Sequence, residues 1–129
     1  MITTLYGYYE LRQMLPTHAS FANEASLARY EAHRKDLFTN KLGLPPAGFK
    51  DADVLEFGPD TGENALVFAR WGAKMHLVEP NENAWPIIEN YFSSYEVSKS
   101  LCSLEKADVA GYHSDRTFDV IVAEGFIYT

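Results

Sequence analysis

The segment VLEFGPDTGENAL, residues 54–66, constrains the fold of this chain more than any other. It opens with a short, mainly apolar run that contains one acid, Glu56, and such a run is typical of a buried strand. Gly58 and Gly62 then allow a tight loop, and a helix is expected from Glu63. A strand, a glycine loop and a helix start in this order bring backbone amides and a helix N-terminus to one point, which suits a ligand.

Strands and helices alternate along the chain from Asp51 onward. The last strand is the clearest, because DVIVA is a β-branched run bounded by turn residues. Alternation of this kind predicts an α/β fold with a doubly wound parallel sheet. Gly72 is the expected cap of the first helix. We expect strands at 54–57, 74–79, 102–106 and 118–123, and helices at 63–71 and 83–91.

Residues 1–50 precede this alternation and are expected to form a helical unit of their own, whereas residues 51–129 form the sheet. From Ser20 to Leu42 few helix breakers occur, and Gly43 with two following prolines supplies a stop. We therefore expect one or two helices here and then a linker to about Lys50.

The formal net charge of -7 is unevenly distributed. Counting Lys and Arg against Asp and Glu, residues 1–50 carry 6 against 4 and residues 51–129 carry 5 against 14, so the halves sum to +2 and -9. No basic stripe is available for a phosphate backbone, so a nucleic-acid partner is not expected. The acidic half suits a cationic ligand, although acidic balance also simply favours solubility.

Cys102 is the sole cysteine, which rules out an internal disulfide and a cysteine-based zinc cluster. No run of 18 apolar residues occurs, and the N-terminus has no basic segment followed by a continuous apolar core. We therefore expect no membrane partner and a reducing, cytoplasmic setting. The four histidines show no ligand spacing, so no metal site is expected: His18, His33, His76 and His113.

Two large families place a glycine loop after the first strand. The dinucleotide-binding fingerprint requires G-x-G-x-x-G, but counting from Gly58 its second and third glycine positions hold Asp60 and Glu63. The stretch instead resembles motif I of the class I S-adenosylmethionine-dependent methyltransferases, an acid, any residue, then G-x-G-x-G. Glu56, Gly58 and Gly62 match that motif, while Asp60 replaces its middle glycine. Aspartate tolerates left-handed backbone better than most residues.

Three later landmarks strengthen the resemblance. Glu79 ends the second strand, 21 residues after the loop begins, where the family has an acid that takes both ribose hydroxyls. Asp108 follows the third strand, where the family commonly has an aspartate facing the adenine amino group, and the amide of Val109 would donate to a ring nitrogen. The pair Phe118-Asp119 stands ten residues further on and opens the fourth strand, as in the family.

The resemblance implies transfer of a methyl group from S-adenosylmethionine, with S-adenosylhomocysteine as product, by positioning donor and acceptor in line. Amides near Gly58 and Gly62 would meet the methionine portion, and Glu56 would lie beneath its amino group or order the loop. Glu124 and Gly125 would sit beside the sulfonium and the acceptor. Glu124 is a candidate for binding the cofactor's ammonium, for binding the acceptor or for acting as a base, or it merely faces water. No catalytic residue is identified.

The N-terminal helices resemble the cap that many small-molecule methyltransferases lay over the cofactor, which favours a small-molecule acceptor. Four tyrosines are candidates for lining such a site or for core positions: Tyr6, Tyr8, Tyr9 and Tyr30.

The family's sheet has seven strands in the order 3-2-1-4-5-7-6, and only the first four are found here. The expected Rossmann-like sheet is thus incomplete after strand 4, and acceptor-binding segments usually follow that strand. The chain is a fragment, a shortened version, or a short protein that completes its sheet as a homodimer through the strand 4 edge. Two other functions stay open: an NAD(P)-linked oxidoreductase, and a catalytically silent binding or assembly module.

Overall fold

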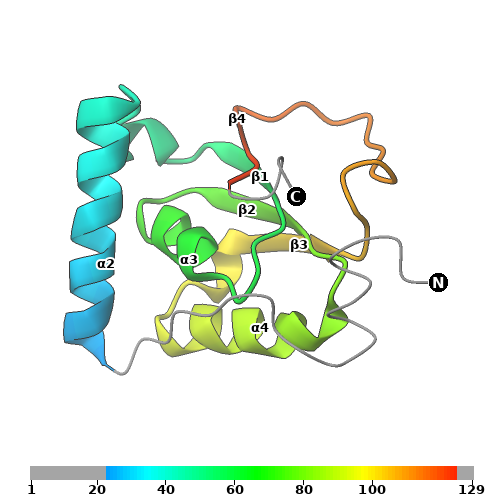
Figure 1. Ribbon diagram of the computed structural model, residues 1–129, viewed down its shortest axis with the longest axis horizontal. Helices are drawn as coiled ribbons and strands as arrows, with labels where there is room; N and C mark the ends of the chain where they lie inside the picture. The colour runs from blue at the N-terminus through cyan, green and yellow to red at the C-terminus, as the bar shows by residue number, and fades with distance from the viewer. Residues whose placement is uncertain (1–22, 125–129) are drawn as a thin grey trace.

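A four-stranded parallel sheet runs through the part of the chain that the computed structural model describes, residues 23–124 (Figure 1). Every pairing is parallel, and Val54 at the centre pairs with Met75 on one side and Val120 on the other. The order is β3-β2-β1-β4, which confirms the Rossmann-like arrangement predicted from the sequence. The strands are β1 (Asp53–Phe57), β2 (Lys74–Val78), β3 (Leu101–Glu105) and β4 (Val120–Val122).

Two helices cover one face of the sheet. Helix α3 (Glu63–Arg70) follows β1 and helix α4 (Trp85–Ser94) follows β2, and the two helices contact each other. The alternation of strand residues decides what they bury, because Val54, Met75 and Leu77 point to this face and are fully buried. The second helix starts later than expected, since residues Glu82–Ala84 form a separate 3-10 turn before it.

Helix α2 (Glu24–Asp36) stands beside this layer, at the left of Figure 1. Its start is fixed by a capping box in which Asn23 and Ser26 exchange side-chain and backbone hydrogen bonds. It continues into a π-helical turn, Leu37–Lys41, so the expected helical content before Leu42 is confirmed within the described residues.

The segment before β1 packs into the same core as the sheet. Leu27 of α2, Phe38 and Phe49 are buried in one cluster with the residues of β1 and α3. Phe49 lies in a 3-10 turn, Pro46–Phe49, so the expected linker is an ordered part of the core. The boundary placed at residue 50 stays a prediction.

The second face of the sheet is crossed by residues 106–119, which form no helix and carry the chain from β3 back to β4. Phe118 packs edge-on against His76 of β2, and Arg116 Nη1 lies 3.3 Å from His76 Nδ1. Asp119 anchors the end of this segment, because its carboxylate accepts a 2.8 Å hydrogen bond from Asp53 N at the start of β1. The Phe-Asp landmark therefore has a structural role at the end of the sheet opposite to the glycine loop.

Candidate functional site

The glycine loop after β1 has the left-handed backbone that its sequence predicts. Gly58 has φ 64°, Asp60 has φ 62° and Gly62 has φ 90°. The amide of Gly58 donates to the carbonyl of Val78 at 2.9 Å, which ties the loop to the end of β2. Asp60 thus takes the conformation of the glycine that it replaces, at the cost that left-handed backbone imposes on a residue with a side chain.

Glu79, directly after β2, holds the loop from the other side. Its Oε1 accepts from Asp60 N at 3.0 Å and its Oε2 accepts from Asn81 N at 2.8 Å. The residue is fully buried, so these charge-assisted bonds offset part of the cost of burying the carboxylate. The ribose-binding role predicted for Glu79 stays a prediction.

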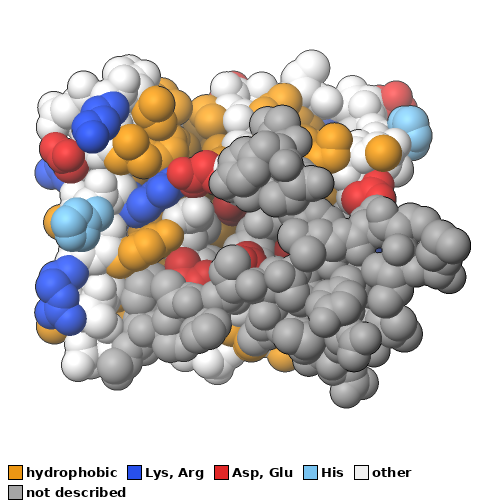
Figure 2. Space-filling model, viewed as in Figure 1, with side chains coloured by type: hydrophobic (Ala, Val, Ile, Leu, Met, Phe, Trp, Pro, Cys, Tyr) orange, Lys and Arg blue, Asp and Glu red, His pale blue; other side chains and the backbone are white. Residues whose placement is uncertain are grey.

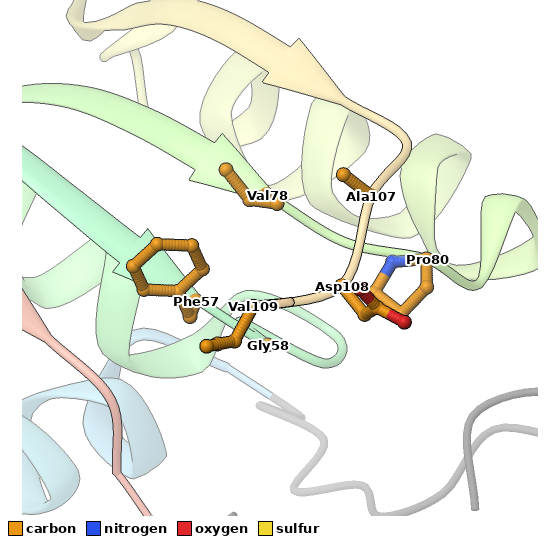
Figure 3. A pocket seen from close by; sticks show the side chains of 7 residues that line it. All are labelled: Phe57, Gly58, Val78, Pro80, Ala107, Asp108 and Val109. Atoms are coloured by element: carbon orange, nitrogen blue, oxygen red, sulfur yellow. The ribbon is translucent and has the colours of Figure 1, made fainter. Parts of the chain in front are cut away.

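A shallow hollow lies beside the loop, between the carboxyl ends of β1, β2 and β3 (Figure 3). Figure 3 draws Val109 beside Gly58 and Asp108 beside Pro80. It is a shallow depression of the surface and does not enclose a cavity of the size that holds a whole small molecule. The lining residues are Phe57, Gly58, Val78, Pro80, Ala107, Asp108 and Val109.

Asp108 is exposed, and its Oδ1 already accepts a 2.7 Å hydrogen bond from Gly111 N. This bond closes the turn that carries Val109, whose side chain is 49% exposed. The carboxylate therefore orders its own loop at the mouth of the hollow, and its contact with an adenine amino group stays a prediction.

Glu56, the acid of the motif, is buried beneath the loop at the end of β1. The residue is 2% exposed, and its Oε1 has no hydrogen-bond partner among residues 23–124. Burial raises the pKa of Glu56 to about 8, and the negative charge of Glu124 adds to that rise, whereas Arg34 opposes it. A positive charge placed beside this carboxyl group would therefore lower its pKa.

Glu124, just after β4, is fixed by side chains from two helices. Arg34 of α2 donates to both of its oxygens, Nη1 to Oε1 at 2.9 Å and Nη2 to Oε2 at 2.5 Å. Asn64 of α3 donates to Oε2 at 3.0 Å and accepts a hydrogen bond from the Tyr30 hydroxyl. These three hydrogen bonds fix the position of the Glu124 carboxylate at the end of β4.

The guanidinium of Arg34 is itself held in place. It lies 5.1 Å from the ring centre of Phe38 and 5.9 Å from that of Phe68, so it rests on the aromatic core. Tyr30 is half-buried beside it, and burial raises the pKa of its hydroxyl to about 12. Tyr6, Tyr8, Tyr9 and Gly125 lie outside the described residues.

All eight residues predicted to bind the cofactor thus lie along the edge where the four parallel strands end. Glu56, Gly58, Asp60, Gly62 and Glu79 form its centre, Asp108 and Val109 flank the hollow, and Glu124 lies beyond β4. Arg34 and Asn64 were missed, because they stand 90 and 60 residues from Glu124 and no motif marks them.

Other kinds of site find no support in the described part of the chain. Residues 23–124 contain no group of three or more His, Cys, Asp or Glu side chains placed to hold a metal ion. In the same range no helix has both the length and the apolar character needed to cross a membrane.

Comparison with known families shows whether the chain belongs with the methyltransferases that its glycine loop resembles. The model of a family described as a methyltransferase domain matches residues 27–129, about four fifths of the chain. The chain belongs to this methyltransferase domain family. The match includes the whole glycine loop and all four strands, so it covers the candidate site of the methyltransferase domain. No curated protein matches the sequence closely enough to count as a relative.

Solved structures show the same fold at low sequence identity. An S-adenosylmethionine-dependent methyltransferase from Thiobacillus denitrificans, in complex with S-adenosylhomocysteine, is similar with a TM-score of 0.58 and 19% identity over 92% of this chain. Arabidopsis thaliana protein arginine methyltransferase 10 has a TM-score of 0.56 and 18% identity over 95% of this chain. Coclaurine N-methyltransferase, bound to N-methylheliamine and S-adenosylhomocysteine, has a TM-score of 0.56 and 17% identity over 84%. The present chain spans 42% of the first structure's length and 30% of each of the other two.

Proposed function

We propose that this methyltransferase domain binds S-adenosylmethionine at the carboxyl ends of β1 to β4, as the cofactor-binding portion of an enzyme that methylates a small molecule. The observation that carries the proposal is the convergence of Glu56, the glycine loop and Glu79 at one edge of the sheet, beside the hollow of Asp108 and Val109. Membership of the methyltransferase family supports the same cofactor over NAD(P).

The residues at the site fit this cofactor chemically. The hollow lies beside the strand end that carries Glu79, and a carboxylate is the group expected to accept hydrogen bonds from two vicinal hydroxyls. The buried Oε1 of Glu56 can accept from an ammonium, and the acidic neighbours favour a cationic group there. When bound, S-adenosylmethionine supplies a methyl group on a positively charged sulfur.

The chain's own task is then binding and orientation. Amides of the glycine loop hold the amino-acid end, Glu79 and the hollow hold the nucleoside, and Glu124, kept in place by Arg34, forms the wall beyond β4. Positioning of donor and acceptor supplies most of the catalysis in such a transfer. Because the chain spans less than half the length of the three structures named above, we propose cofactor binding for this chain and methyl transfer for the whole enzyme.

The small-molecule acceptor is supported by the packing of α2 and by the charge of the site. Helix α2 is tied to the segment after β4 through Arg34, and Asn64 of α3 bonds to the same Glu124 carboxylate, so two helices lie beside this end of the sheet. Among the described residues in Figure 2, acidic side chains lie near the centre and basic ones gather over α2, and an acidic centre is unfavourable for a nucleic-acid backbone.

Calorimetric titration tests the proposal directly. We expect S-adenosylhomocysteine to bind with a Kd in the micromolar range, about -8 kcal/mol, and NAD to show no binding. Tight binding of NAD would favour an oxidoreductase, and binding of neither ligand would favour a silent assembly module. Either result would overturn the proposed function.

A further inference from the structure

Glu56 is the most isolated acid in the described part of the molecule. It lies on the central strand β1, points to the face covered by α3, and is 2% exposed. No donor within residues 23–124 reaches its buried Oε1. If Glu56 were ionised, the negative charge on Oε1 would have neither water nor a hydrogen-bond donor from residues 23–124, so the neutral acid is favoured.

The charges that face Glu56 come from every element packed around it, and most are negative. Glu124 follows β4, Glu79 follows β2 and Glu63 begins α3, and each raises the pKa of Glu56. Arg34 of α2 is the cation that opposes them, and both of its Nη atoms are engaged with Glu124. Tyr30 of α2 also faces Glu56 and is a neutral phenol at physiological pH, since its pKa is about 12.

We propose that Glu56 carries a proton in the free protein and that binding of a cationic ligand at the glycine loop releases this proton to solvent. The O–H bond of the carboxyl group breaks, the proton passes to the buffer, and the carboxylate remains as counter-charge to the ligand's ammonium or sulfonium. The inference rests on the proposed function, because it takes the ligand to be S-adenosylmethionine.

The direction of the pKa shift agrees with this inference. With a pKa of about 8, about nine in ten molecules hold the proton at pH 7. A positive charge placed beside the carboxyl group lowers that pKa, so the bound state holds fewer protons than the free state. By linkage, binding must then strengthen as the pH rises from 6 towards 8.

Proton release is measured by titrating S-adenosylmethionine into the protein at pH 7 in buffers that differ in ionisation enthalpy. The dependence of the heat on that enthalpy gives the number of protons exchanged. The α-amino group of the ligand titrates in the same pH range, so the result is read as the difference between wild type and Glu56→Gln. Glu89→Gln, an exposed acid on α4, is the matched control.

We expect wild type and Glu89→Gln to release about 0.5 to 1 proton more than Glu56→Gln at pH 7, and the excess to vanish at about pH 9.5. We also expect wild-type affinity to rise about fivefold to fiftyfold from pH 6 to pH 8 relative to Glu56→Gln, because the slope of the logarithm of affinity against pH equals the number of protons released. Equal proton release by wild type and Glu56→Gln would overturn the inference while leaving the cofactor assignment in place.

A measurement without ligand tests the protonated state independently of the cofactor. The folded pKa of about 8 lies above the ordinary value of 4.5, so the stability that the protonated group contributes is present below pH 4.5 and is lost as the pH rises through 8. The urea midpoint of wild type should therefore fall relative to Glu56→Gln between pH 5 and pH 8.5. A difference between the two proteins that is the same at both pH values would overturn the inference.

Discussion

A methyl group at Gly62 would collide with helix α4. Its Cβ would stand 2.9 Å from Ile88 Cγ1, and its φ of 90° is strained for any side chain. Gly43 has a similar φ of 68° but open space around the Cβ position. Alanine at this position therefore measures the cost of backbone strain without a collision. We expect Gly43→Ala to lower the free energy of unfolding by about 1 kcal/mol, and Gly62→Ala to lower it by about 2–4 kcal/mol, in urea denaturation. Equal losses in the two variants would contradict the close packing of the loop on α4.

Glu79 has a structural role beside its predicted role in binding. Replacement by Ala removes the acceptor for the amides of Asp60 and Asn81, and each buried donor left without a partner costs about 1–3 kcal/mol. We expect Glu79→Ala to lower the free energy of unfolding by a few kcal/mol and to weaken S-adenosylhomocysteine binding by at least tenfold at a temperature where the variant is folded. Exposed Glu82→Ala on the following turn is the control for both measurements. Unchanged affinity in a folded Glu79→Ala protein would exclude this residue from the nucleoside site.

At the residue scale, the sequence predicted those features that depend on the backbone conformation of a few neighbouring residues. Asp60 takes the left-handed conformation because its neighbours in the loop impose it, and short-range spacing contains that information. The partners of Glu124 could not be predicted in this way. Arg34 reaches it only after α2 has packed beside β4, and that packing depends on Phe38 and Phe68 in the core.

At the element scale, α2 is joined to the sheet layer by two sets of polar contacts. Arg70 of α3 pairs with Glu24 at the start of α2 and with Glu31 in its second half, and Arg34 near its end pairs with Glu124. The first set is partly exposed and adds little to stability, whereas Arg34 is largely buried on aromatic rings. The Arg34 contact is therefore the one expected to hold α2 over the end of β4.

Arg34→Ala tests that role. We expect a loss of about 1–3 kcal/mol in the free energy of unfolding, because the variant loses ring packing and leaves Glu124 with Asn64 alone among the partners described above. The control is Arg29→Ala, which removes the same side chain from an exposed position of the same helix and should change stability by less than about 0.5 kcal/mol. A similar loss in both variants would mean that the contact with Glu124 contributes nothing.

Element boundaries were predicted less well than element types. The predicted strand at 118–123 is only Val120–Val122, because Asp119 turns its carboxylate to the start of β1 instead of extending the strand. The helix expected from residue 83 begins at Trp85, since Asn81 accepts from Asn83 N and caps a separate turn first. Both differences arise because a polar side chain forms a hydrogen bond with the backbone. The spacing of apolar residues, from which the boundaries were predicted, contains no information on such bonds.

At the scale of the whole molecule, the feature that matters most for association is the outer edge of β4. Within residues 23–124 no strand pairs with its outer edge, and Ile121 is 63% exposed although it belongs to an apolar strand. Edges of this kind recruit partners. The homodimer predicted from the sequence therefore remains a prediction for this edge.

Sedimentation of the purified chain tests that prediction. We expect association that increases with concentration, and we expect Ile121→Lys to shift it towards monomer by placing a charge at the edge. Leu42→Lys is the control, because Leu42 is 60% exposed and lies outside the sheet. A folded wild-type monomer at high concentration, or an equal effect of the two substitutions, would contradict association through β4.

The central claim is that the carboxyl ends of the strands bind the methyltransferase cofactor, and amide chemical shifts test it most directly. A titration of the ¹⁵N-labelled chain with S-adenosylhomocysteine, followed by NMR, reports every backbone N–H at once. We predict saturable shifts at Gly58, Asp60, Gly62 and Val109, with little change at His76 and Asp119 towards the opposite end of the sheet. Shifts confined to other parts of the chain, or no shifts at saturating ligand, would contradict the account.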